Sequence, residues 1–361
     1  MKFMEFDKKL EEYFRDLEKQ DLFSGVALIT HNRSEEFSGA YGYANRAWKI
    51  PNTMNTRFDI ASITKLFTAI CVLQLIDQDQ LTFNIAVVDF LGLENTAISQ
   101  DVNVFHLLTH SSGIGDDCEE EAGEVYEDLW KLKANYSVTE TVHFLPQFFH
   151  KPANFPPGRG CRYCNCSFVL LGLIIEIISG LSYREYVQRN IFDSVGMIHS
   201  GFFRLDRANE NTAEGSDPLR DESGNIVGWK KNIYSFPPIG SPDSGAYVTA
   251  YDLIDFINAV QSGRLISSDL VKALTTPQVL HCESEEERWM FSYVLEFLLD
   301  AHGQIIFYQK DGVNAGVSAI LRHYPDQDIN VVLLSNMEDG VWEPIRKIHH
   351  FITKDKKKVG K

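Results

Sequence analysis

The sequence is short of basic residues and of long apolar runs. Its 361 residues include 34 Lys and Arg against 50 Asp and Glu, which gives a formal net charge of −16. Such an acidic surface repels phosphate backbones and anionic lipid, so we expect no nucleic-acid partner and no membrane partner. The most apolar stretch, residues 168–179, is too short to span a bilayer and contains Glu176, which indicates a core helix.

The sequence also shows no apolar leader segment near Met1, where charges alternate. Its six cysteines in so long a chain favour reduced thiols, and we therefore expect a cytoplasmic protein. Cys161, Cys164 and Cys166 are close enough to suggest a metal knuckle, but no fourth Cys or His follows at the usual spacing. We accordingly expect no metal and no other cofactor.

The order of the expected elements indicates an α+β fold. An amphipathic helix over 5–19 and two short strands come first, and apolar helical segments fill the middle of the chain. Toward the other end we expect four strands, at 288–298, 304–309, 317–323 and 330–334, and a closing helix over 341–354. The two chain ends would then form an antiparallel sheet flanked by terminal helices.

This order also predicts two domains. Residues 1–62 and 245–361 would form the sheet domain, and residues 63–244 an inserted, mainly helical domain. Within the insertion, residues 202–242 are polar, with scattered Gly and Pro and no sustained period. We expect a long loop there, and loops of that length are usually functional or insertions.

One stretch, residues 58–74, carries the first chemical signal. Ser62 stands where a helical apolar pattern begins, a position at which serine is a favoured cap and unpaired backbone N–H groups collect. Lys65 follows three residues later, so its amine shares a helix face with the Ser62 hydroxyl. A hydroxyl, an amine and free N–H donors are the components of a serine acyl-transfer site. The alternative is an ordinary cap followed by a surface lysine.

Two later segments, together with the helix end at 107–113, strengthen the catalytic interpretation. Tyr163-Cys-Asn165 lies in a turn before a helix, and Lys310-Asp-Gly-Val313 lies in an expected strand, where Gly312 would let a substrate backbone approach closely. The three motifs resemble, in order and spacing, those of the serine beta-lactamase-like superfamily. That superfamily includes class C beta-lactamases, penicillin-binding DD-peptidases and related esterases. The resemblance covers about residues 20–340 and implies the beta-lactamase/transpeptidase-like fold.

The resemblance implies a role for each motif residue. Ser62 would be the nucleophile, Lys65 would help to remove its proton, and Tyr163 would be the partner base and acid. Asn165 would bind Lys65 and the acyl amide of the substrate, and Lys310 would supply positive potential. The backbone N–H groups of Ser62 and Val313 would form the oxyanion hole. Because neighbouring cations lower the pKa of an amine, we expect Lys65 and Lys310 to lower each other's pKa.

Structural interpretations stand beside these roles. Tyr163 could simply pack against its helix, Asn165 could be an N-cap, and Lys310 could be a strand-edge lysine that discourages aggregation. His106 and His110 suggest a Ser–His pair, but we expect them to be a helix-end hydrogen bond and a packed ring.

The sequence departs from the family pattern at Asp311, where beta-lactamases and DD-peptidases of this type carry Thr or Ser. A carboxylate removes a hydroxyl donor and repels a substrate carboxylate, so it places penicillin and D-Ala-terminated substrates in doubt. We predict a serine hydrolase that forms an acyl-enzyme on an ester, amide or peptide, with an esterase or D-amino-acid peptidase favoured. Asp311 would then bind a substrate amine. The alternatives are a DD-carboxypeptidase or class C beta-lactamase, and a catalytically silent binding protein; the oligomeric state stays open.

Overall fold

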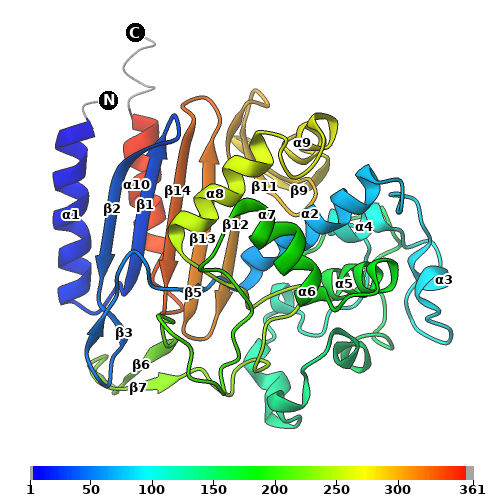
Figure 1. Cartoon of the computed structure of the whole chain (residues 1–361), viewed down its shortest axis with the longest axis horizontal. Helices are drawn as coiled ribbons and strands as arrows, with labels where there is room; N and C mark the ends of the chain where they lie inside the picture. Colours follow the sequence, from blue (N-terminus) through cyan, green and yellow to red (C-terminus); the bar gives the residue numbers. More distant parts are fainter. Residues whose placement is uncertain (1–2, 355–361) are drawn as a thin grey trace.

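A computed structural model describes residues 3–354, and its centre is an eight-stranded antiparallel sheet (Figure 1). The strands follow the order β2-β1-β14-β13-β12-β11-β10-β9. Their bounds are β1 Gly25–His31, β2 Ser34–Tyr41, β9 Val279–Glu283, β10 Glu287–Phe291, β11 Glu296–Asp300, β12 Ile305–Asn314, β13 Val317–Tyr324 and β14 Ile329–Ser335. The sheet joins both chain ends, because β1 pairs with β14 from Gly25↔Ser335 to His31↔Ile329. The predicted α+β class is confirmed.

The two faces of the sheet are covered by different helices. Two terminal helices, α1 (Phe3–Lys19) and α10 (Trp342–Lys354), cover one face (Figure 1). In β14, Val331 and Leu333 pack with these helices, whereas Val332 and Leu334 belong to the larger core on the other side. Successive side chains of a strand point to opposite faces, so the continuous apolar run of β14 fits a strand that is buried on both.

The helical region packs around α2 (Thr64–Asp77), in which eleven of fourteen residues are buried. A helix that is apolar all round belongs in a core, and α2 indeed packs against α5 within the larger buried cluster. The other helices are α3 Val87–Leu91, α4 Val104–Leu108, α5 Asn165–Ser179, α6 Tyr183–Val187, α7 Asp193–Val195, α8 Ala250–Gln261 and α9 Ser268–Leu274. Short strand pairs complete the fold, namely β3 Tyr43–Asn45 with β4 Ile50–Pro51, β5 Phe58–Asp59 with β8 Tyr247–Val248, and β6 Ser216–Arg220 with β7 Ile226–Lys231.

The local structure departs from expectation in three places. The single strand expected over 288–298 is two strands, β10 and β11, separated by a turn in which Val294 has a φ of 73°. Segments 126–132 and 138–145, which are helical candidates by sequence, form 3₁₀ helices at Tyr126–Lys131 and Thr141–Gln147 and not α-helices. The polar segment 202–242 contains the β6–β7 hairpin. The turn at Val294 could not be predicted from the sequence, because no Gly or Pro stands there.

One buried apolar cluster reaches from Val332 in the sheet to Leu170 in the helical region. The division into a sheet domain and an inserted helical domain therefore stays a prediction. Among residues 3–354, no single helix is long and apolar enough to cross a membrane. One bent pair, Asn165–Ser179 with Tyr183–Val195, passes that test only when the two helices are taken together.

Helix α5 approaches the chain before β8 unusually closely. A Cβ atom added at Gly172 would overlap the ring of Pro242. The carbonyl of Pro242 in turn accepts a hydrogen bond from Thr68 Oγ1 on α2, at 2.5 Å. Gly172 therefore allows α2, α5 and residue 242 to meet, next to the site described below.

We expect Gly172→Ala to destabilise the protein by about 1–3 kcal/mol, although Ala is the better helix former. The added methyl group must displace Pro242 or move α5. Urea unfolding of the variant and the wild type measures the change. Gly228→Ala is the matched control, because its added Cβ would meet only Leu219 Cδ1, at 3.6 Å. Equal stability of Gly172→Ala and wild type would contradict this account of the packing.

Candidate active site

Ser62 lies in a tight turn between β5 and α2. The turn, Ala61–Ile63, is a 3₁₀ helix, and Ala61 has a φ of 42°. The buried carboxylate of Asp59 supports it, because its Oδ1 accepts the Ala61 N–H at 2.7 Å. The N-cap of α2 is Ile63, so the prediction that Ser62 caps the helix was wrong. The Ser62 hydroxyl is thus presented from the turn, free of a capping role.

Lys65 is fully buried, and its ammonium donates to three oxygens. The acceptors are Ser62 Oγ at 3.0 Å, Asn165 Oδ1 at 2.8 Å and the carbonyl of Asp243 at 2.7 Å. The expected contact between Ser62 and Lys65 across one helix turn is therefore present. The alternative of a solvated surface lysine is wrong.

Asn165 is the first residue of α5, and its side chain points at Lys65 rather than at its own helix. The N-cap position belongs to Cys164, so the N-cap interpretation of Asn165 was wrong. The carboxylate of Asp116 instead accepts the N–H groups of Asn165 and Cys166, both at 2.9 Å. The helix dipole favours a carboxylate at a helix N-terminus. Because Asp116 binds these N–H groups, the Asn165 side chain is not needed as a cap and can bind Lys65.

The Tyr163 ring lies between the two lysines of the motifs. Lys65 Nζ is 5.1 Å and Lys310 Nζ 5.0 Å from its ring centroid. His110 packs against it, with ring centroids 4.6 Å apart, and His110 Nδ1 accepts the Cys164 N–H at 3.1 Å. Burial and the two lysines hold the pKa of His110 well below its usual value. His110 is thus the packed ring that we expected. His106 makes the helix-end hydrogen bond: its N–H donates to the N-cap Asn103 Oδ1 of α4, and its Nδ1 accepts the Asn103 N–H.

Lys310 on β12 is also fully buried, which overturns the interpretation of an exposed strand-edge lysine. Its Nζ lies 2.6 Å from Glu296 Oε1 on β11 and 3.2 Å from Asp311 Oδ1. Two carboxylates therefore surround this ammonium. The positive potential that we expected from Lys310 is largely neutralised by its own neighbours.

The backbone of β12 passes directly beside the Ser62 turn. A Cβ atom at Gly312 would overlap the carbonyl oxygen of Ile60 and lie 2.8 Å from Ser62 N, so only glycine fits. On one side, β12 pairs with β11 only as far as Gln309, which lies opposite Glu296. On the other side, β12 stays paired with β13 as far as Asn314. Residues 310–314 thus leave one edge toward the cavity, beside Ser62. This arrangement is compatible with the oxyanion hole predicted from Ser62 and Val313.

The pKa of Lys65 differs from our expectation. Burial and, more weakly, Lys310 lower it, but Tyr163 and Asp243 raise it, and the net direction is upward. Burial also lowers the pKa of Lys310. The charges of Glu296, Tyr163 and Asp311 outweigh this effect, so the pKa of Lys310 is raised as well. The expected effect of one amine on the other is present at Lys65, whose pKa Lys310 lowers, but it does not decide the net shift, which is upward. Both are ammonium groups at neutral pH.

The three clustered cysteines do not gather into a knuckle. Cys161 Sγ approaches Thr109 O at 3.7 Å, Cys164 Sγ approaches Asp116 Oδ1 at 3.6 Å, and Cys166 Sγ accepts the Asp117 N–H at 3.2 Å. Burial raises the pKa of Cys164 and of Cys166 well above the usual value, which favours neutral thiols. Among the described residues, the group whose ligand atoms lie close enough for a metal is Asp116, Asp117 and Cys166.

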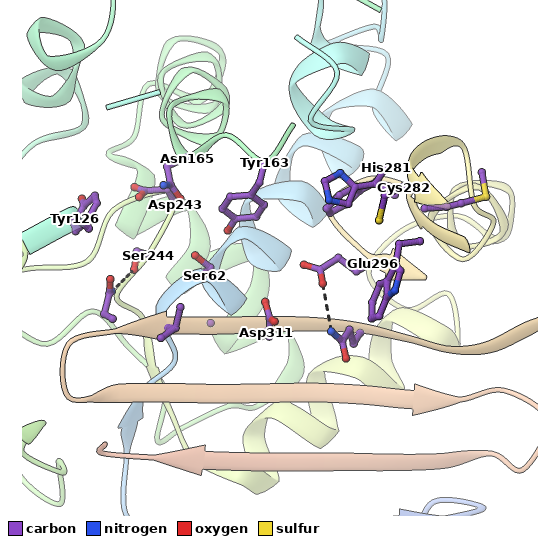
Figure 2. Close-up of a pocket in the computed structure, with 17 residues that line it drawn as sticks. Ser62, Tyr126, Tyr163, Asn165, Asp243, Ser244, His281, Cys282, Glu296 and Asp311 are labelled. Atoms are coloured by element: carbon purple, nitrogen blue, oxygen red, sulfur yellow. Dashed lines mark hydrogen bonds between the residues drawn. The ribbon is translucent and has the colours of Figure 1, made fainter. Parts of the chain in front are cut away.

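A cavity of about 460 Å³ opens over Ser62 (Figure 2). Ser62, Tyr163 and Asn165 line it from the helical side, and Asp311, Gly312 and Val313 from the sheet. Figure 2 shows Ser62 below Tyr163, with Asp311 on β12 and Glu296 beside it. Residues from three distant parts of the chain thus surround one hydroxyl, as a serine acyl-transfer site requires.

Comparison with known proteins agrees with this fold. Residues 10–349 match the beta-lactamase family, so the chain belongs to the beta-lactamase family of serine hydrolases. A penicillin-binding protein from Bacillus halodurans of known crystal structure is 37% identical, with a TM-score of 0.85 over 94% of this chain and 99% of that one.

More distant relatives differ in their named activities. The putative penicillin-binding protein PbpX of Bacillus subtilis (strain 168) is 26% identical over 347 residues, which cover 94% of this chain and 76% of the relative. The D-amino acid amidase from Ochrobactrum anthropi SV3 is 19% identical, with a TM-score of 0.72 over 95% of this chain and 98% of that one. This last likeness shows the fold alone.

Sequence reasoning missed four acidic residues of the site, namely Asp59, Asp116, Asp243 and Glu296. None belongs to a motif that stands out in the sequence, and each acts through a contact with a distant or turn residue. Only Asp59 had a local signal, since an Asp two residues before the N–H that it accepts is typical of an Asx turn.

Burial raises the pKa of Asp59 to about 7, although the Ala61 N–H acts against the shift. An unfolded Asp titrates near pH 4. Between about pH 4 and 7 the folded protein therefore binds more protons than the unfolded chain, and this group lowers the free energy of unfolding as pH rises. We expect Asp59→Asn, which keeps the acceptor, to gain stability relative to wild type across that window. Urea unfolding from pH 4.5 to 8 tests this, and a difference that does not change with pH contradicts it.

Proposed function

We propose that this protein hydrolyses an ester, amide or peptide through an acyl-enzyme on Ser62. The observation that carries the proposal is the hydrogen bond between Lys65 Nζ and Ser62 Oγ in a cavity that also holds Tyr163 and Asn165. A serine hydroxyl is a poor nucleophile at neutral pH unless basic groups surround it. The substrate is a small molecule or peptide, and no metal or cofactor takes part in the proposed reaction.

In the proposed mechanism, Ser62 Oγ attacks the substrate carbonyl carbon, and its proton passes to the oxygen of Tyr163, the base that the family resemblance implies. The raised pKa of Lys65 favours the ammonium form of this amine, which supports that assignment. Lys65 then stabilises the developing charge and orients Asn165. The Ser62 and Val313 N–H groups bind the oxyanion, a contribution that is typically worth a few kcal/mol. Tyr163 returns the proton to the leaving group, and water later releases the acyl group.

Within this reaction class we favour an esterase or a D-amino-acid peptidase. Support comes from Asp311, which lines the cavity and pairs with Lys310 in place of a hydroxyl that would bind a substrate carboxylate. A relative of this fold is a D-amino acid amidase. The alternative is a DD-carboxypeptidase or a class C beta-lactamase, which the 37% identity to a penicillin-binding protein favours. The cytoplasmic location stays a prediction.

Ser62→Ala should abolish turnover of short p-nitrophenyl esters and remove covalent labelling. Intact-protein mass spectrometry after incubation with the ester, a D-amino-acid nitroanilide and a reporter penicillin detects the acyl adduct. We expect an adduct on wild type and none on the variant. Lys65→Met should lose at least about a hundredfold in acylation rate. Wild type that remains unlabelled and inactive with all three compounds would favour the catalytically silent binding protein.

Asp311→Thr restores the hydroxyl that the family pattern carries. It should raise the rate of penicillin acylation and lower hydrolysis of free-amine D-amino-acid nitroanilides, because the donor replaces a negative charge. Stopped-flow acylation and steady-state kinetics measure the two effects. No change in either rate would show that position 311 does not select the substrate.

A further inference from the structure

The cavity over Ser62 is lined by carboxylates and by no Lys or Arg. Of the seventeen residues that line it, Asp243, Glu296 and Asp311 are acidic and none is Lys or Arg. Lys65 and Lys310 lie behind this lining with no exposed surface. A substrate therefore meets the two partly exposed carboxylates, Glu296 and Asp311, before either amine.

Lys310 cannot bind a substrate carboxylate without losing its ion pairs with Glu296 and Asp311. Its ammonium is bound to Glu296 at 2.6 Å and to Asp311 at 3.2 Å, and it faces the Tyr163 ring. With both acids ionised, these two carboxylates and one ammonium have a formal net charge of −1. Burial, and then repulsion from the Asp311 carboxylate, raises the pKa of Glu296 against the effect of Lys310. A second cation between them would relieve that repulsion.

A further cation, Arg322, lies behind this cluster. Arg322 on β13 donates to Gln309 Oε1 at 2.9 and 2.6 Å, and Gln309 Nε2 donates to Glu296 at 3.3 Å. The guanidinium is thus separated from Glu296 by the Gln309 amide, and it does not line the cavity. It supports the position of Glu296 without occupying the space that faces a substrate.

Aromatic side chains form the wall on the same side of the cavity. His281, Trp289 and Phe291 line it near Glu296, as Figure 2 shows for the labelled His281 and Glu296. An ammonium group is attracted both by carboxylates and by the faces of aromatic rings. Carboxylates, rings and the Ser62 hydroxyl thus line the same cavity.

We propose that Glu296 and Asp311 bind an ammonium group of the substrate and so select cationic esters or amides for attack by Ser62. This inference rests on the proposed function and names the substrate class of that same site. Glu296 is a specificity-determining residue that no motif of the sequence indicates. The same two carboxylates disfavour substrates with a carboxylate at this position.

Two isosteric substrate pairs test the proposal on either side of the scissile bond. The acyl-side pair is the p-nitrophenyl ester of γ-trimethylammoniobutyrate and its analogue with a tert-butyl terminus. The leaving-group pair is acetylthiocholine and its tert-butyl analogue. We expect the cationic member of at least one pair to have about tenfold higher kcat/KM in wild type, and the preference to shrink at high salt.

Variants of the subsite should lose this preference. Glu296→Gln and Asp311→Asn keep the side-chain shape, and the ratio of cationic to neutral kcat/KM should fall toward one in each. Taking the ratio within one variant cancels any general loss of activity. Glu222→Gln, an exposed acid on the β6–β7 turn, is the control and should keep the wild-type ratio. Equal or lower kcat/KM for the cationic members of both pairs would overturn the proposal.

A binding experiment separates this inference from the proposed function. Calorimetry with phenethylamine and with hydrocinnamate compares opposite charges at the end of similar aromatic chains, without any turnover. We expect the amine to bind about tenfold more tightly to wild type and the difference to vanish in Asp311→Asn. Tighter binding of hydrocinnamate, or equal binding, overturns the inference even if the neutral esters are hydrolysed. Tighter amine binding without turnover of any ester overturns the proposed function alone.

Discussion

The structure of the site depends on the burial of one charged amine. The Lys65 ammonium has no exposed surface, and a buried charge is costly unless it is paired and hydrogen-bonded. Its three acceptors come from its own helix turn, from Asn165 and from the carbonyl of Asp243, which lie 100 and 178 residues away in the chain. The requirement to satisfy this amine therefore ties three segments together around Ser62.

A second set of contacts holds those segments in place. Asp116 binds the first N–H groups of α5, and Gly172 lets α5 approach Pro242. Thr68 on α2 donates to the carbonyl of Pro242, just before Asp243. These contacts fix the positions of the residues that accept from Lys65. The reactive geometry thus depends on residues that do not touch the Ser62 hydroxyl.

The second lysine shows how neighbours decide what a motif residue can do. Lys310 stands where the family resemblance placed it, but Glu296 and Asp311 both pair with it. An ammonium with two carboxylate partners offers little net attraction to an anion. Membership of the beta-lactamase family of serine hydrolases therefore leaves the charge of the preferred substrate to be set by residues that the three motifs do not specify.

The sequence alone determined the α+β class, the terminal helices and the three motifs that meet at the cavity. It could do so because the hydrophobic periodicity, the order of the motifs and the spacing of Ser62 and Lys65 can all be read along the chain. It did not indicate the turn at Val294, which no Gly or Pro marks, or the cap of α5 by Asp116. Nor did it indicate the sign of the pKa shift at Lys65 or the Glu296 partner of Lys310. Only the tertiary structure decided these, because each depends on a contact with a distant part of the chain. At Val294 that contact is a backbone hydrogen bond to the carbonyl of Leu108, and at the other sites it is the set of charged and polar groups buried together.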